Sequence, residues 1–443
     1  MNKIVPAPSA HVMSREADKA DLTSKSIYAD KAVLLRQLAP RDGKPAPVKL
    51  LSGKWLLARA EQIRKALPDE RPMLKLPRRQ DLQDEAFLTM EQVMNLPQHS
   101  THPNAPLRIV SISHCWLTPE HPDPCGEQLL NFADAMKRQQ AQGKCSSGEA
   151  CCDCSFGGFW FSMCTGTICR CCCDVSHPPC VVWRWFPSGE FAVFYDYCSL
   201  HQKNPVDKLR TEDEQEAFGL ALSKMGSWYA HLHLTTVCLS RLPEGWESDA
   251  CRPYSKRGWT TFEHLVSVLG KPANDYSWPL VIDAGGALGE CRQAPMTPDA
   301  FSEVLEEKHF TSGADRAIVA GIYKETLLGV LGGAVDLRYE RLGWGDEEAE
   351  LLASVLQYAT SVTYIVLINN RIGDRGAKAI AQAIKEGAAP KLRRINLDAN
   401  LIGSSGTAAL RDACEGRTWT VRATRRGRAR KQSIHWSANP HGG

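Results

Sequence analysis

Short apolar runs alternate with amphipathic stretches through the middle of the chain. The apolar runs are rich in β-branched and aromatic residues, and we expect each to be a strand: 107–113, 191–195, 232–239 and 279–283. Patterns with a helical period lie between them, at 127–139, 213–225 and 259–269. This alternation predicts an α/β domain over 107–296 with a parallel sheet, whose ligands bind at the carboxyl ends of the strands.

The segment before this domain has a helical pattern interrupted by prolines. Helical periodicity covers 29–38, 50–66 and 85–96. We therefore expect a helical lead-in over 28–106 that packs on the α/β domain. Residues 1–27 are polar and mixed in charge, and their composition predicts disorder.

The pattern changes again at residue 297. Helical patterns at 301–308 and 315–330 predict a helical linker or cap over 297–333. An internal repeat follows, in which Leu337, Leu367 and Leu397 are spaced by 30 residues. The second and third copies share Leu-x-x-Asn-x-Ile-Gly, whereas the first is degenerate and has Glu340 in the place of Asn. Each copy continues into a helical pattern (349–356, 377–384, 407–413), which predicts a short α/β solenoid over 334–416.

Composition and charge narrow the class of protein. The 443 residues carry a net charge of +3 and are 43% hydrophobic, as in ordinary globular proteins. The N-terminus has no signal-peptide pattern and the chain has no run of about 18 apolar residues, so we expect a cytoplasmic protein. After Glu415 only basic charges remain, and we predict a basic disordered tail over 417–443 and no nucleic-acid partner.

The 17 cysteines are unevenly placed, with ten of them between Cys145 and Cys180. Two Cys-x-x-Cys pairs suit one tetrahedral zinc ion: Cys151, Cys154, Cys169 and Cys172. Alternatively, the apolar stretch 158–168 beside these cysteines favours palmitoylation and association with a membrane. A third interpretation is an insertion in a surface loop, and the pattern leaves all three open.

Candidate site residues follow the predicted strands. Asp196, Cys198 and Gln202 come directly after the second strand, and His114 ends the first. Because the carboxyl ends of parallel strands share one edge of a sheet, we expect these side chains near a ligand site. Glu263 follows Trp259 by four residues on a predicted helix. The same glutamate also fits a capping box with Thr260, which is a purely structural interpretation.

Two of these segments resemble the TIR and HET (heterokaryon-incompatibility) domains. The first reads Asp196-Tyr197-Cys198-Ser199-Leu200-His201-Gln202, and the second Arg257-Gly258-Trp259-Thr260-Thr261-Phe262-Glu263. The resemblance implies a flavodoxin-like parallel sheet and self-association into homo-oligomers. The repeats resemble leucine-rich repeats of the ribonuclease-inhibitor type, so the whole chain is similar to sensors of innate immunity.

The resemblance implies two alternative functions. One is an intracellular signalling or scaffold protein that binds protein partners through its repeats. The other is an NAD glycohydrolase, because enzymatic TIR domains use the Glu of Trp-x-x-x-Glu to cleave NAD at the nicotinamide–ribose bond. In that enzyme the candidate catalytic residues are Glu263, Asp196 and His114. The candidates for binding NAD are Trp259, Cys198 and Gln202. A third hypothesis is a membrane-tethered adaptor lipidated in the Cys-rich segment 145–180.

Overall fold

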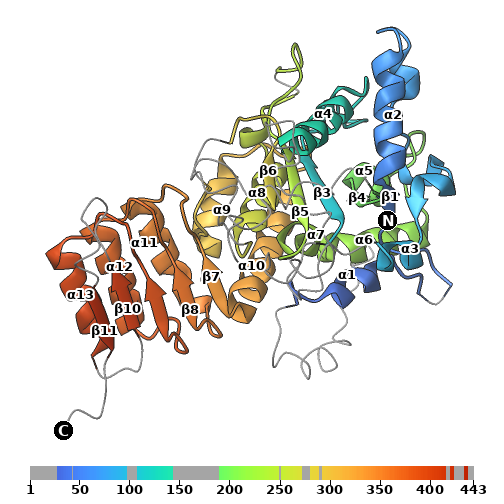
Figure 1. Ribbon diagram of the computed structural model, residues 1–443. Coiled ribbons are helices and arrows are strands. Elements are labelled where there is room, and N and C mark those ends of the chain that lie inside the picture. Colours follow the sequence, from blue (N-terminus) through green and yellow to red (C-terminus); the bar gives the residue numbers. More distant parts are fainter. Residues whose placement is uncertain are drawn as a thin grey trace, which may run out of the picture.

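The computed structural model describes residues 27–41, 43–96, 107–142, 189–248, 251–271, 280–288, 292–415, 420–423 and 434–437. These residues form two α/β assemblies, each with its own sheet (Figure 1). The predicted α/β class is therefore confirmed. The predicted disordered N-terminus and the Cys-rich segment lie outside the described residues, apart from Ile27.

The first sheet is mixed and has the strand order β2-β1-β4-β3-β5-β6. Its strands are β1 (Leu50–Ser52), β2 (Phe87–Leu88), β3 (Ile109–His114), β4 (Ala192–Phe194), β5 (Thr235–Leu239) and β6 (Val281–Asp283). The four strands β3 to β6 are parallel and coincide with the four predicted ones. β1 pairs antiparallel with β4, and β2 pairs antiparallel with β1, so the lead-in is part of this sheet and not only helical.

Helices pack on both faces of this sheet. They are α1 (Lys31–Leu38), α2 (Gly53–Lys65), α3 (Met90–Met94), α4 (Glu127–Gln142), α5 (Asp196–Ser199), α6 (Glu212–Ser223), α7 (Met225–Ala230) and α8 (Gly258–Val268). Alternate residues of β3 divide between two cores: Val110 and Ile112 pack with residues of α2 and α4, and Ile109 lies in the core that includes α7 and α8. All six residues of α7 are buried, so its sequence has no amphipathic period and the helix was not predicted.

Two further helices join this sheet to the repeats. They are α9 (Pro298–Glu306) and α10 (Asp315–Gly333), and α10 packs against α7 and α8. One buried hydrophobic core runs from α8 through α10 into the repeats. The indole of Trp344 donates to the carbonyl of Arg292 at 2.7 Å, and the hydroxyl of Tyr339 donates to the carbonyl of Leu269. The predicted linker therefore both caps the repeats and joins them to the first sheet.

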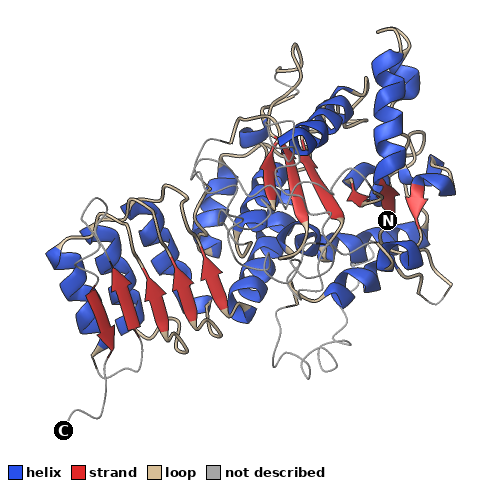
Figure 2. Ribbon diagram, in the orientation of Figure 1, coloured by secondary structure: helices blue, strands red, loops and turns tan. Residues whose placement is uncertain are grey.

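The second sheet is formed by the repeats. Four parallel strands, β7 (Asp336–Arg338), β8 (Tyr364–Val366), β9 (Arg394–Asn396) and β10 (Thr420–Ala423), are followed by the antiparallel edge strand β11 (Ile434–Ser437). Helices α11 (Asp346–Val355), α12 (Asp374–Lys385) and α13 (Ser404–Cys414) lie on one side of it (Figure 2). The prediction of a disordered tail from residue 417 is wrong at β10 and β11.

The strand register corrects the alignment of the first repeat. Leu337 pairs with Ile365, which pairs with Ile395, so the first repeat is 28 residues long and not 30. Tyr339 therefore corresponds to Leu367. The residue of the first repeat that corresponds to Asn370 is Leu342, and not Glu340. The sequence alignment failed because this repeat has lost its Asn, and the leucine two positions earlier gave a misleading match.

Buried asparagines hold adjacent repeats together. The Oδ1 of Asn370 accepts hydrogen bonds from the backbone N–H of Leu342 at 2.9 Å and of Trp344 at 3.2 Å. Asn400 accepts in the same way from Ile372 at 3.0 Å. Each side chain thus satisfies backbone groups at the turn of the preceding repeat. Within the described residues, no helix has both the length and the apolar character needed to cross a bilayer.

Candidate active site at the carboxyl edge of the first sheet

The predicted residues His114, Asp196 and Glu263 all lie at or near the carboxyl edge of the parallel strands. His114 ends β3, Asp196 follows β4, and Glu263 is on α8, which packs against β3. β4, the next strand of the chain after β3, lies on one side of β3 in the sheet, and β5 lies on its other side. Such a reversal of strand order opens a crevice in α/β sheets and is where their ligands usually bind.

His114 and Asp196 form the first part of this site. The Nε2 of His114 lies 3.5 Å from the Oδ1 of Asp196, and the indole of Trp116 donates to the Oδ2 of Asp196 at 3.1 Å. The imidazole stacks on the ring of Tyr195 with 4.5 Å between centroids. Burial lowers the pKa of His114, and the nearby Asp196 only partly opposes this. His114 is therefore neutral at pH 7, and the Asp196 carboxyl, with 24% of its side chain exposed, is the accessible group.

Glu263 forms a second, buried network. The hydroxyl of Ser113 lies 2.5 Å from its Oε2 and also 2.5 Å from the hydroxyl of Tyr254. Tyr229 hydrogen-bonds to the same carboxyl group. Burial raises the pKa of Glu263 well above its ordinary value, against the effect of the Ser113 hydrogen bond, and the charge of Asp196 raises it further. The neutral form of the Glu263 carboxyl group is therefore favoured in the folded protein.

The capping-box interpretation of Glu263 is wrong. Helix α8 begins at Gly258 with Arg257 as its N-cap, so Glu263 lies in the second turn. The hydroxyl of Thr260 donates to the carbonyl of Tyr254 at 2.5 Å, and the helix has no side-chain cap. Capping of helix α8 therefore does not explain why Glu263 is buried at this position.

The two networks approach the strand end from opposite sides. Ser113 and His114 are successive residues of β3, so their side chains point to opposite faces of the sheet. Ser113 reaches Glu263 on the α8 side, whereas Ile112 and Tyr195, on the other face, pack in the core with α4. Within the described part of the chain, Glu263 forms no hydrogen bond with His114 or Asp196. The coupling between Glu263 and Asp196 is electrostatic.

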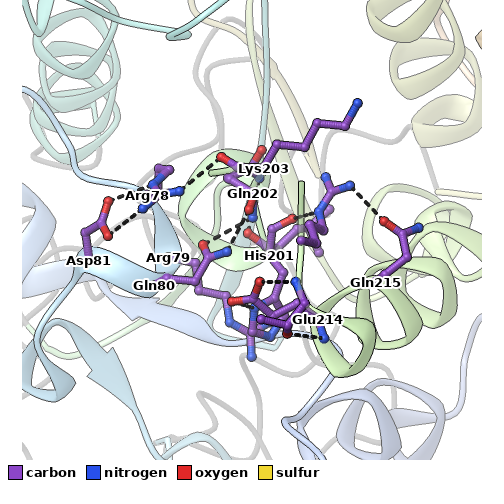
Figure 3. A network of polar contacts seen from close by, with 12 residues as sticks. Arg78, Arg79, Gln80, Asp81, His201, Gln202, Lys203, Glu214 and Gln215 are labelled. Carbon is purple, nitrogen blue, oxygen red and sulfur yellow. Dashed lines mark hydrogen bonds and ion pairs between the residues drawn. The ribbon is translucent and has the colours of Figure 1, made fainter. Parts of the chain in front are cut away.

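Cys198 and Gln202 belong to a different environment. The thiol of Cys198 is buried and donates to the carbonyl of Pro77 at 3.4 Å, and burial raises its pKa well above the ordinary value. Gln202 donates to the carbonyl of Leu200 at 3.1 Å, and its backbone N–H donates to Gln80 at 3.2 Å (Figure 3). The Cys198 thiol and the Gln202 backbone thus tie the segment after β4 to the 77–80 region. The Gln202 amide also donates to the backbone carbonyl of Asp196 at 3.3 Å, and not to its carboxyl group.

The same region holds a buried arginine and a buried histidine (Figure 3). Arg79 donates to the carbonyls of Ala46, Pro47 and Ser199 at 2.6, 2.8 and 3.0 Å. The Nδ1 of His201 lies 3.5 Å from Glu214, and burial lowers the pKa of His201 to about 4. These contacts explain the polar residues after β4 by packing rather than by ligand binding.

Trp259 also lies away from the other candidates. Its indole donates to Asp315 of α10 at 2.9 Å and meets Phe262 edge-on at 6.1 Å between centroids. Of the six predicted site residues, the structure therefore pairs His114 with Asp196 and places Glu263 on the opposite side of β3. The side chain of Trp259 bonds to α10, that of Cys198 to Pro77, and that of Gln202 to backbone carbonyls of its own segment.

The residues that surround Glu263 were not predicted. Ser113 carried a signal, because it is a polar residue within the apolar run that forms β3; nothing in the sequence marked Tyr229 or Tyr254. Across the described ranges, no group of three His, Cys, Asp or Glu side chains is arranged to hold a metal ion. The predicted zinc ligands Cys151, Cys154, Cys169 and Cys172 lie outside these ranges.

Comparison with known proteins adds no assignment. No protein-family model matches the chain, and a search of curated proteins finds no significant match. The functional argument therefore rests on the geometry of the two assemblies.

Proposed function

We propose that the protein is a signalling or scaffold protein that binds protein partners through its repeats. On this proposal the repeats are leucine-rich repeats of the ribonuclease-inhibitor type, and the first sheet belongs to a flavodoxin-like, TIR/HET-like domain that self-associates. Protein-binding solenoids use extended open surfaces of this kind.

The open face of the repeat sheet is the observation that carries this proposal. Helices α11 to α13 all lie on the other side of the strands (Figure 2). Within the part of the chain that the structure describes, no helix covers the strand side. Arg394 on this face is exposed, and Arg338 and Tyr364 are partly exposed. Arginine and tyrosine are the residue types that most often dominate the energy of protein interfaces.

Proximity labelling in cells tests this proposal. The full chain is fused to a biotin ligase and compared with Tyr364→Ala on the open face and with Arg375→Ala on helix α12. We expect Tyr364→Ala to lose a defined group of labelled neighbours that Arg375→Ala retains. Identical neighbours for all three proteins would reject binding through this face. Light scattering tests self-association, which requires a mass above the 49.0 kDa of one chain.

An NAD glycohydrolase is the second candidate, and the position of Glu263 favours it. Glu263 has no capping role, and its carboxyl group interacts electrostatically with that of the partly exposed Asp196 across the end of β3. Glycosidic cleavage uses two carboxyl groups, of which the general acid has a raised pKa. Burial raises the pKa of Glu263, which makes it the candidate for the acid. Asp196 would then stabilise the positive charge that develops on the ribose.

Release of nicotinamide tests the enzyme. The full chain at high concentration is incubated with NAD, and Glu263→Gln and Asp196→Asn are compared with Glu303→Gln on the surface of α9. The enzyme predicts that the first two variants lose release and the third keeps it. No release by the wild-type protein, including in its self-associated form, would reject this candidate.

The zinc and lipidation hypotheses concern residues outside the described ranges, and both remain proposals. Metal analysis of the purified protein tests zinc, which requires about one equivalent per chain. Membrane fractionation with and without the cysteines of 145–180 tests the membrane-tethered adaptor.

A further inference from the structure

Three side chains form a cationic stretch on the open face of the repeat sheet. The guanidinium carbon of Arg394 lies 5.1 Å from the centroid of the Tyr364 ring, and that of Arg338 lies 5.7 Å from it. Tyr364 is on β8, between Arg338 on β7 and Arg394 on β9. One aromatic ring on the middle strand thus positions two cations, one on each neighbouring strand. Two strand spacings separate these cations by about 10 Å.

Arg394 is the cation with unused binding capacity. Within the described residues it forms no ion pair, and it is exposed. Arg338 has Glu340 at 3.4 Å, and Arg422 on β10 is paired with Asp398. A guanidinium that stacks on a ring keeps its N–H groups in one plane, where they match the two oxygens of a carboxylate.

The carboxylates around this stretch limit what it can bind. Asp336 lies opposite Tyr364 in the register, and Glu340 and Asp398 follow β7 and β9. They would repel a continuous row of phosphates, as in nucleic acid, but leave room for separate carboxylates at Arg394 and Arg338. The ring of Tyr364 adds a contact for apolar atoms between them.

We infer that this stretch binds an acidic segment of a protein partner, with its Asp or Glu carboxylates on Arg394 and Arg338 and its chain over Tyr364. The inference rests on the proposed partner-binding function and names the chemistry of the partner. It makes Arg394 the residue that selects acidic segments.

Fluorescence anisotropy with labelled octaglutamate tests the inference on the full chain. We expect salt-sensitive binding that Arg394→Glu weakens at least about five-fold, and that Tyr364→Ala also weakens. Arg375→Glu makes the same change of charge on α12, where Arg375 pairs with Glu350 at 2.9 Å. This control should stay within about two-fold of the wild type, because its charge lies on the helix side.

Three outcomes would overturn the inference. They are no binding of octaglutamate, equal weakening by Arg394→Glu and Arg375→Glu, or tighter binding of a short DNA duplex with the same dependence on Arg394. In the first two cases the proposed function would still stand if proximity labelling continued to depend on Tyr364. Failure of this inference can therefore be told apart from failure of the proposed function.

Discussion

The hydroxyl of Ser113 lies 2.5 Å from the Oε2 of Glu263 and links the end of β3 to the second turn of α8. Two elements that are 150 residues apart in the chain are thus joined by a buried hydrogen bond. Removing one partner of such a bond lowers the free energy of unfolding markedly, because the other polar group stays buried with neither a partner nor water.

The raised pKa of Glu263 makes its amide variant a direct test. We expect Glu263→Gln to change the free energy of unfolding by less than about 1 kcal/mol, since a neutral amide still accepts from Ser113. Glu263→Ala should cost about 2–4 kcal/mol, because it leaves the hydroxyls of Ser113 and Tyr229 without this partner and opens a cavity. Urea unfolding followed by circular dichroism measures both. Equal destabilisation by the two variants would show that the carboxyl is ionised.

A second prediction concerns Asp374, which caps the following repeat. Its Oδ1 accepts from the backbone N–H of Gly403 at 2.6 Å and of Gly406 at 2.9 Å. We expect Asp374→Ala to lower the free energy of unfolding by about 1–2 kcal/mol, as for the loss of other helix caps. Asp412→Ala on α13, whose only ion pair in the described chain is with Lys385 at 3.6 Å, should change it by less than about 0.5 kcal/mol.

The pH dependence of this cap follows from its pKa. Partial burial raises the pKa of Asp374, but the hydrogen bonds from Ser405, Gly403 and Gly406 outweigh burial and lower it below 3.8. The folded-state pKa is thus depressed, and the stabilisation is complete above the unfolded value and lost as the pH falls through the folded one. The difference between wild type and Asp374→Ala should shrink below about pH 4. A difference that is constant from pH 7 to pH 3 would contradict the cap.

The sequence predicted the parallel strands because each is a dense apolar run, as fully buried strands are. It did not predict β1 or β2, since two or three residues, such as Phe87–Leu88, are too few to show a period. In the site, His114 and Asp196 were proposed because they lie at strand ends, and Glu263 because of its Trp-x-x-x-Glu spacing. Cys198 and Gln202 were proposed on the same ground as Asp196, and Trp259 on the same ground as Glu263. The direction of the Trp259 and Cys198 side chains depends on their partners Asp315 and Pro77, which no local pattern reveals.

A third prediction uses the buried carboxyl group of Asp123, just before α4. Its Oδ2 accepts from the backbone N–H of Leu129 at 2.9 Å, whereas its Oδ1 is buried without a hydrogen-bond partner in the described residues. Burial raises the pKa of Asp123 from 3.8 to about 6, against the effect of the Leu129 hydrogen bond. The folded state therefore holds a proton that the unfolded chain releases, and stability falls as the pH rises from about 4 to about 6.

The amide variant removes this dependence. Asp123→Asn keeps an acceptor for Leu129 and carries no charge, so it should gain up to about 3 kcal/mol relative to the wild type between pH 4 and pH 7. Thermal or urea unfolding at a series of pH values measures the difference. Buried histidines such as His201 titrate equally in both proteins and cancel. Parallel stability curves for the two proteins would show that Asp123 is ionised at an ordinary pKa.

The last prediction compares two neighbouring arginines. Arg79 is buried and donates to three backbone carbonyls, and burial lowers its pKa to about 10. Adjacent Arg78 pairs with the exposed Asp81 at 2.7 Å. Lysine cannot reproduce the planar fork of a guanidinium, so Arg79→Lys should leave carbonyls unsatisfied and cost about 2–3 kcal/mol of unfolding free energy. Arg78→Lys loses the bidentate contact with Asp81 and the bond to the carbonyl of Lys203, but these groups are exposed to water, so it should cost about 1 kcal/mol or less. Equal effects of the two substitutions in urea unfolding would mean that Arg79 does not hold the segment after β4 in place.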